Sequence, residues 1–291
     1  MLDPEVEELL WSWSWDPTVV SGLTLGGALY ALGWWRLRRP SGERQVLPAW
    51  RAWCFAVGLV TLWVALLSPI DEFTELLFSA HMVQHLLLVE VAAPLLLLGA
   101  PLLPMLWALP RDLRVVLGSL FGPDVRTRQI FDLLTHPLVA ESLYVAALSV
   151  WHLPVFYDEA QGRTAVHDME HMVFLGTALL FWWPIIHPAG GKRRLSYAAA
   201  IPYLLPPMLV GSLIGALLTF AQHPLYSTYQ QVPRMWGITV VQDQQLDGLI
   251  MWVPGGMAYL IPILLLVALH VRQEDRLADA RLGKGAEGSG V

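Results

Sequence analysis

Two pairs of histidines are the residues of this 291-residue chain whose types and spacing could do chemistry. His81 and His85 open one apolar stretch, SAHMVQHLLLVEVAAPLLLL, and His167 and His171 open another, HDMEHMVFLGTALLFWW. Both pairs read H-x-x-[Q/E]-H, and a spacing of four places two imidazoles on one face of a helix, which turns once in about 3.6 residues. Because imidazole is a common ligand of copper, zinc and iron, the pattern predicts a site for a metal ion or a haem.

Other polar and sulfur-containing side chains accompany these pairs. Gln84 and Glu170 occupy the same place within the two pairs, and we expect supporting roles for both. Met82 and Met172 are candidate soft ligands, although methionine in an apolar helix more often serves as packing. Asp247, in QDQQLDGLIMWVPGG, could accept an imidazole N–H and so fix the tautomer that presents the other nitrogen to a metal.

Composition identifies an integral membrane protein, because 55% of the residues are hydrophobic and only 14% are charged. Seven apolar windows are long enough to cross about 30 Å of hydrocarbon. The windows lie at approximately residues 17–35, 50–69, 79–98, 137–153, 167–186, 198–221 and 247–270. We therefore expect an all-α bundle of seven transmembrane helices in one domain, residues 1–275, with a disordered cytoplasmic tail, residues 276–291. Pro94 is expected to kink the third window or to end its hydrogen bonding early.

The basic residues predict how this bundle is oriented. Of the 18 Lys and Arg residues, 16 fall on one side of the seven windows, and loops rich in these residues stay in the cytoplasm. The N-terminus is therefore expected outside and the C-terminus in the cytoplasm. The acidic N-terminus lacks the basic segment of a signal peptide, so the first window is expected to remain in the protein. In this orientation both histidine pairs lie near the outer face, where the window 137–153 ends with His152.

The rest of the composition excludes several classes of protein. The single cysteine, Cys54, rules out a disulfide framework and any Cys-x-x-Cys motif, so a metal must be held by His, Met or carboxylate. The net charge of −6 and the lack of an RNA or DNA motif give no reason to expect a nucleic-acid partner. Because no catalytic nucleophile or nucleotide motif is evident, we expect no enzymatic role.

Four blocks of the sequence together resemble the CtaG-type cytochrome c oxidase assembly factor family of seven-span bacterial membrane proteins. The blocks are SAHMVQHLLLVEVAAPLLLLGAPL, WHLPVFYDEA, HDMEHMVFLGTALLFWWPI and QQLDGLIMWVPGGMAYL, within residues 50–270. The resemblance implies a protein of the bacterial plasma membrane that helps to mature the terminal oxidase by supplying or inserting copper, with the oxidase subunits as partners. The ligands it implies are His81, His85, His152, His167 and His171, with Asp247 as weaker support.

Copper also suits the predicted site on chemical grounds. Imidazole accommodates Cu(I), Cu(II) and zinc, and nearby thioethers favour Cu(I). A site at the outer face could receive copper from an extracytoplasmic carrier and pass it laterally to a partner in the same lipid bilayer. The sequence leaves open whether the protein forms a homodimer.

Two alternatives remain open at this stage. HDMEH satisfies H-x-x-E-H, the pattern in which two histidines bind zinc and the glutamate is a general base, so Glu170 could serve an intramembrane metalloprotease. The matching HMVQH has Gln84 where that base would stand, and two pairs are more than a protease needs. A bis-histidine haem protein is the other alternative, because facing histidines on neighbouring helices are adequate haem ligands. We rank the copper assembly factor first, the haem protein second and the protease third.

Overall fold

A computed structural model describes residues 9–38, 47–120, 122, 125–186, 195–232 and 236–288, with side chains up to residue 280. Every regular element in these ranges is helical, which confirms the predicted all-α class. In chain order the elements are α2 (Pro17–Arg38), α3 (Ala49–Leu67), α4 (Pro69–Thr74), α5 (Phe78–Leu86), the π-helix η1 (Leu87–Ala92), α6 (Ala93–Leu98), α7 (Leu102–Ala108), α8 (Arg111–Leu120), α9 (Arg126–Leu134), α10 (Pro137–Trp151), α11 (Pro154–Gly162), α12 (Thr164–Ile186), α13 (Tyr197–Tyr203), α14 (Leu205–Phe220), the 3-10 helix η2 (Thr228–Gln230) and α15 (Val240–Gly288).

Five helices in the described part of the chain are long and apolar enough to cross a membrane. They are Ala49–Leu67, Phe78–Leu98, Thr164–Ile186, Tyr197–Phe220 and Val240–Ala280. A sixth crossing results if α9 and α10, which meet at 63°, form one broken span. The first predicted window forms α2, which is long enough at 22 residues but carries Ser, Thr and Gly residues that make it less apolar. A membrane protein with several apolar helices is therefore established, whereas seven crossings remain a prediction.

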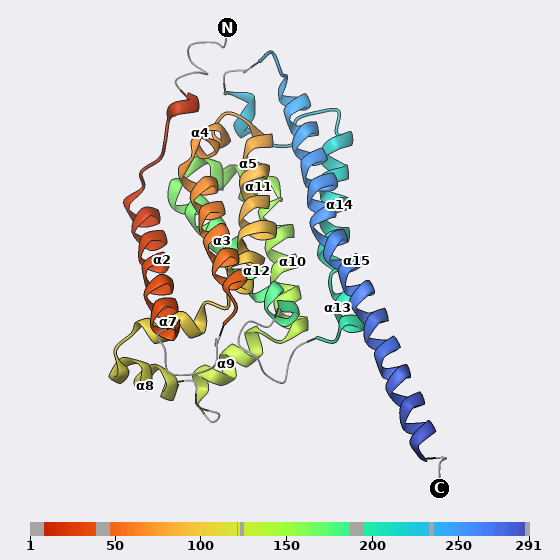
Figure 1. The fold of residues 1–291 in the computed structure, drawn as a ribbon. Helices are drawn as coiled ribbons and strands as arrows, with labels where there is room; N and C mark the ends of the chain where they lie inside the picture. Colours follow the sequence, from red (N-terminus) through yellow and green to blue (C-terminus); the bar gives the residue numbers. More distant parts are fainter. Residues whose placement is uncertain are drawn as a thin grey trace.

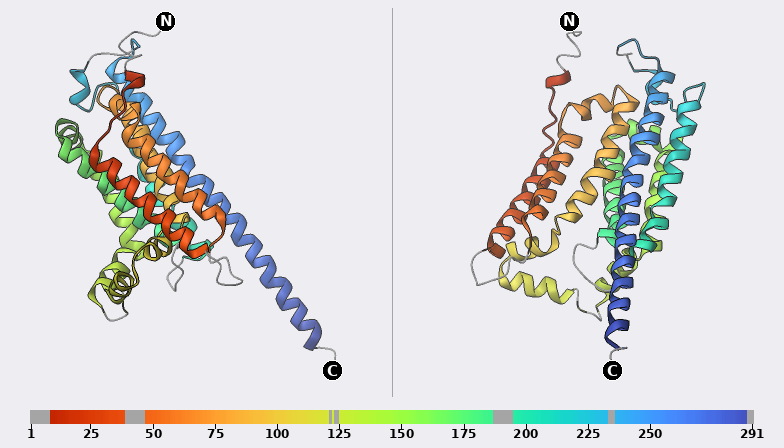
Figure 2. Two further views of the ribbon diagram at one scale, coloured as in Figure 1. Left: turned by 60° about the vertical axis from the view of Figure 1, so that its left-hand side comes forward. Right: turned by 45° about the vertical axis from the view of Figure 1, so that its right-hand side comes forward.

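The helix Phe78–Leu98, built from α5, η1 and α6, is the centre of the bundle. Of its apolar window 56% is buried, against 22–33% for the other four candidate spans. It packs against α3, α12 and α15, which Figures 1 and 2 show around it. A polar side chain on this helix is therefore enclosed by protein, which is the usual environment of functional polar groups in membrane proteins.

Pro94 changes the hydrogen bonding of this central helix. Proline has no N–H to donate to the preceding turn, and residues Leu87–Ala92 just before it adopt a π-helix. The N–H of Ala93 donates to the carbonyl of Leu88, five residues earlier, and not to that of Val89, four residues earlier. The carbonyl of Val89 therefore lacks the donor that it would have in an α-helix. Trp182 of α12 replaces that donor through its indole N–H, at 3.1 Å. The interruption expected at Pro94 is thus a widened turn that α12 holds in place.

The helices α14 and α15 pack side by side through two glycines. A Cβ atom added to Gly248 would lie 2.5 Å from the carbonyl oxygen of Gly215 and 2.6 Å from the backbone nitrogen of Thr219. Only glycine allows two helix backbones to approach so closely. This contact fixes the first half of α15, which carries Asp243 and Asp247, against the bundle.

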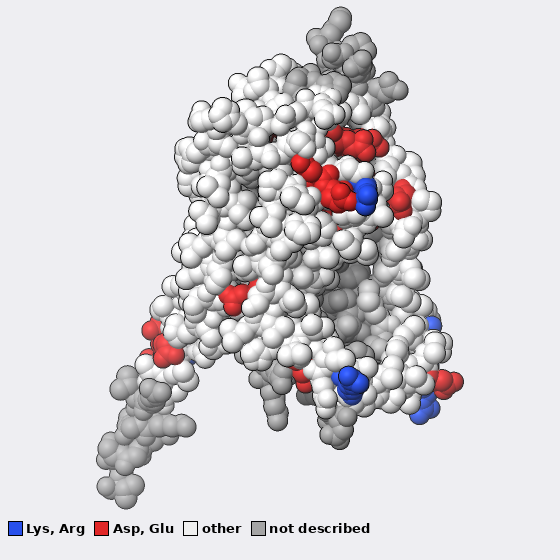
Figure 3. Space-filling model, turned by 180° about the vertical axis from the view of Figure 1, so that it is seen from behind, with Lys and Arg blue, Asp and Glu red and all other residues white. Residues whose placement is uncertain are grey.

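The two ends of the bundle differ in charge. The helices α5 and α12 begin at one end, and α15 extends past the other (Figures 1 and 2). On the face in Figure 3, acidic side chains gather near the first end with one basic group among them, and both basic and acidic groups lie near the other. The predicted orientation rests on the distribution of the Lys and Arg residues along the sequence, and the side of the membrane stays a prediction. α15 continues to Gly288, so most of the predicted tail 276–291 is helical.

Candidate metal centre

The first turns of α5 and α12 bring four histidines together. The ring centroids of His81 and His85 lie 4.1 Å apart on α5, and those of His167 and His171 lie 4.2 Å apart on α12. Between the helices, His81 is 5.3 Å from His167 and His85 is 5.4 Å from His171. These four residues, which we call the four-histidine cluster, place their imidazole rings next to one another.

Each imidazole of the cluster has an Nε2 atom with no hydrogen-bond partner among the described residues. His81 is 0% exposed and His85 5%, whereas His167 and His171 are partly exposed. A buried polar atom without a partner destabilises a protein by about 1–3 kcal/mol, so native structures contain few of them. Four such atoms in one place are explained if they hold a cation.

Glu170 of α12 lies within the cluster and is only 1% exposed. Its two carboxylate oxygens are each 4.0 Å from an Nε2 atom, one of His81 and the other of His85. Ligand atoms of these three residues all lie within 4.8 Å of one another, a spacing that one ion can bridge. The sequence predicts only a supporting role for Glu170, but its carboxylate stands where a ligand would stand. It also brings negative charge to a buried site for a cation.

Asp243 of α15 fixes the start of α5. Its carboxylate accepts hydrogen bonds from the backbone N–H groups of Phe78 (2.8 Å) and Ser79 (3.1 Å) and from the hydroxyl of Ser79 (2.7 Å). The first N–H groups of a helix lack an acceptor within the helix, and the helix dipole favours a carboxylate at this end. Asp243, which the sequence analysis does not single out, therefore holds the backbone that carries His81 and His85.

Gln84 points away from the cluster and ties α5 to its neighbours. Its amide donates to the carbonyl of Ala65 in α3 (2.8 Å) and to Asp71 in α4 (2.7 Å). Burial raises the pKa of Asp71 to about 6, although the hydrogen bond from Gln84 acts in the opposite direction. Gln84 thus supports the position of α5, which is compatible with the role expected for it.

Gln161, at the end of α11, touches the cluster directly. The side-chain Nε2 of Gln161 lies 2.8 Å from Nδ1 of His81. If the amide is turned end for end, its oxygen accepts Nδ1–H, and the Nε2 lone pair of His81 is left for a metal. No spacing in the sequence indicates this contact, because the packing of α11 on α5 creates it.

The other predicted site residues lie around the cluster. Nδ1 of His152 donates to the carbonyl of Leu148 at 2.7 Å. Asp247 is 0% exposed, and both its carboxylate oxygens lack a hydrogen-bond partner among the described residues. The expected hydrogen bond from an imidazole N–H to Asp247 is therefore not seen among these residues. Met82 is buried at 2% exposure, whereas Met172 is 67% exposed on the outside of α12 and does not point into the cluster.

Aromatic side chains close the cluster at the end where α5 and α12 begin. The ring of Tyr157 lies 5.3 Å from that of His81, and its hydroxyl pairs with that of Tyr229, which also donates to the carbonyl of Thr74. Asp158 of α11 accepts hydrogen bonds from the loop around η2; partial burial raises its pKa, but these bonds outweigh that effect and lower it. Tyr157 and Tyr229 are themselves buried, and the low dielectric of such surroundings strengthens electrostatic interactions.

The fold and the site define a polytopic helical membrane protein with a buried candidate metal centre. Residues 28–273 match the family described as cytochrome c oxidase caa3 assembly factor (Caa3_CtaG), and the chain therefore belongs to that family. Similar proteins include uncharacterised proteins of Mycobacterium bovis and Mycobacterium tuberculosis, each 28% identical over 285 residues, and one of Mycobacterium leprae, 26% identical over 283 residues. These matches cover 94% of this chain but only 42% of each relative's length. No solved structure matches the chain.

Proposed function

We propose that this protein binds copper at the four-histidine cluster and helps to deliver it to, or insert it into, cytochrome c oxidase. The observation that carries the proposal is the set of four partnerless Nε2 atoms, two of which, those of His81 and His85, lie 4.0 Å from the carboxylate of Glu170. The chain belongs to a family of cytochrome c oxidase assembly factors. Because this oxidase contains copper, it is the proposed recipient of the ion.

The donor set favours a transition metal. Imidazole nitrogens with one carboxylate suit copper and zinc, whereas magnesium and calcium prefer oxygen ligands. The charge of Glu170 offsets part of the charge of a buried ion, which lowers the free energy needed to bury it. A centre that passes its metal on must exchange ligands, and partly exposed imidazoles allow this better than a closed tetrahedral cage. The proposed ligands are His81, His85, His167, His171 and Glu170.

The proposed route of copper follows from the predicted orientation. With the acidic end of the bundle outside, the cluster lies near the extracytoplasmic surface, where a copper carrier loads it. An oxidase subunit in the same bilayer then receives the ion. Copper is the cargo of this process, and the protein binds and transfers it without acting as an enzyme.

The same geometry bears on the two alternatives. The axial ligands of a haem iron stand on opposite faces of a flat macrocycle, and ring centroids only 4.1–6.5 Å apart leave no space for one within the cluster. A protease of the H-x-x-E-H type needs its glutamate to activate a water. Glu170 instead faces His81 and His85, the histidines of the other pair.

The first experiment measures the copper content of the full-length protein purified without a His-tag, since a tag competes for the same ions. The double variants H81A/H85A and H167A/H171A should each lose copper and stay folded, because the apolar runs that drive membrane insertion are unchanged. H136A/H270A is the matched control, since it removes two histidines outside the cluster. Full copper occupancy in either cluster variant would refute the proposal.

A second experiment concerns the cell. Cells without this protein should assemble an oxidase whose copper content falls more than its haem content, and added copper should partly restore activity by mass action. The measurement is the ratio of copper to haem in the purified oxidase. Normal copper with missing haem would favour the haem alternative, and a fully metallated, active oxidase would rule out the proposed partner.

A further inference from the structure

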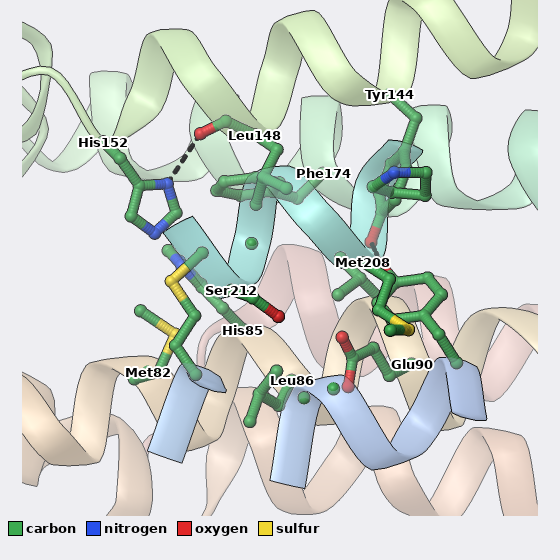
Figure 4. Close-up of a pocket in the computed structure, with 17 residues that line it drawn as sticks. Met82, His85, Leu86, Glu90, Tyr144, Leu148, His152, Phe174, Met208 and Ser212 are labelled. Atoms are coloured by element: carbon green, nitrogen blue, oxygen red, sulfur yellow. Dashed lines mark hydrogen bonds between the residues drawn. The ribbon is translucent and has the colours of Figure 1, made fainter. Parts of the chain in front are cut away.

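A small cavity lies deeper in the bundle than the four-histidine cluster, between α5, α10, α14 and α15. Its volume is about 30 Å³, enough for a single water molecule or metal ion and far too small for a cofactor such as haem. His85 borders this cavity as well as the cluster, so one imidazole separates the two. The side chains at the end nearest His85 include His152 and Met82 (Figure 4).

His152 presents a nitrogen lone pair to this cavity. Its Nδ1 lies 2.7 Å from the carbonyl oxygen of Leu148, and because a carbonyl can only accept, Nδ1 carries the proton. Nε2 is then the unprotonated nitrogen, and Figure 4 shows it turned toward His85 at the end of the cavity. The ring of His152 contacts that of Phe174, with 6.3 Å between their centroids. His152 is thus oriented as a ligand at the boundary between this cavity and the four-histidine cluster.

Two thioethers line the same cavity. Met82 of α5 is 2% exposed and Met251 of α15 is 5% exposed. A Cβ atom added to Gly211 would lie 3.8 Å from the methyl carbon of Met251 and 3.9 Å from the side chain of Leu148, so both side chains border the space beside Gly211. Thioethers are soft ligands with no hydrogen-bonding demand, and they select Cu(I) over harder ions.

We propose that His152, Met82 and Met251 form a second metal site that is selective for Cu(I). The site lies beyond the proposed function of the four-histidine cluster, because it uses other donors. All three donors are neutral, which suits a monovalent ion, and the carboxyl group of Glu90 in the wall of the cavity can supply the single compensating charge. Zn²⁺ and Cu²⁺ would retain uncompensated charge in this apolar interior, whereas the cluster offers them Glu170.

The test uses the full-length protein without a His-tag, loaded with Cu(I) under anaerobic conditions and examined by X-ray absorption. Sulfur scattering from bound copper is expected in the wild type. It should disappear in M82L/M251L, because leucine keeps the volume of methionine but offers no ligand. The matched control is M169L/M172L, which removes two exposed thioethers of α12 and should keep the sulfur signal. If M82L/M251L does not fold, the single variants M82L and M251L should each lower the number of sulfur neighbours.

The two proposals fail in different ways. H167A/H171A leaves the second site intact, so its total copper should fall while the sulfur signal remains. Sulfur scattering that is absent from the wild type, or unchanged in M82L/M251L, would overturn the second site and leave the cluster unaffected. Undiminished copper in H167A/H171A would instead overturn the proposed function of the cluster and leave the second site standing.

Discussion

Gln161 is the residue whose side-chain amide contacts Nδ1 of His81, and replacing it by Ala should weaken metal binding. Without the amide 2.8 Å from Nδ1, the ring can rotate and change tautomer. Loss of such an outer contact lowers metal affinity about 10–100-fold. A competition titration with a chromophoric Cu(I) chelator measures the change. Gln129→Ala, on the exposed side of α9, is the control. Equal Cu(I) affinities of the two variants would show that Gln161 has no part in metal binding.

Asp71 should make stability depend on pH in a defined window. Burial raises its pKa from 3.8 to about 6, so the folded protein binds the proton more tightly than the unfolded chain does. The stability that this proton contributes is complete below pH 3.8 and is lost as the pH rises through about 6. Asp71→Asn does not titrate and keeps an acceptor for Gln84. Across this window the thermal midpoint of the wild type should therefore fall relative to that of D71N, and parallel curves would contradict the assignment.

The sequence predicts single residues well where local geometry decides their position. The spacing in HMVQH and HDMEH places His81 beside His85 and His167 beside His171, because one helical turn separates them. The contacts of Gln161 and Asp243 could not be predicted in this way. Each depends on how a helix distant in sequence packs against α5, and no periodic pattern encodes that packing.

Among the helices, the contact of α14 with α15 is the one most sensitive to a single substitution. Gly248→Ala would place a methyl group 2.5 Å from the carbonyl oxygen of Gly215, so the two helices must separate. Such overpacking destabilises a protein by about 1–3 kcal/mol, and a lower unfolding temperature in detergent is expected. Gly26→Ala on α2, where nothing lies within 4 Å, should leave stability unchanged or raise it. Equal stability of G248A and G26A would contradict the close approach of α14 and α15 at Gly215 and Gly248.

At the same scale, the apolar windows predicted most helices but not their internal breaks. Pro94 marks an interruption of the third window, yet its form as a π-helix depends on the indole of Trp182 from another helix. The window 198–221 is divided into α13 and α14 at Leu204, which the three prolines of the sequence IPYLLPP flank. The composition of a window predicts the length of a span, whereas contacts with other helices determine how interrupted backbone hydrogen bonds are replaced.

For the whole molecule, the separation of charge predicts which end faces the cytoplasm. Glu159 of α11 and Arg126 of α9 are both exposed and lie toward opposite ends of the bundle. In a C54S background, a membrane-impermeant maleimide should label E159C in intact cells but not R126C. Both should react once the cells are permeabilised. The reverse pattern would place the four-histidine cluster at the cytoplasmic face and exclude loading from outside.

The unequal burial of the four histidines gives the candidate centre a direction. His167 and His171 on α12 are partly exposed, whereas His81 and His85 on α5 are enclosed by protein. In the proposed function, an arriving ion would therefore meet the α12 pair first and reach the α5 pair by stepwise exchange, shedding its hydration shell as it moves inward. Release would reverse that sequence, so the inner pair would set the residence time of the metal. A partner that takes up the ion would have to compete only with the outer pair once the bonds to the inner pair had opened.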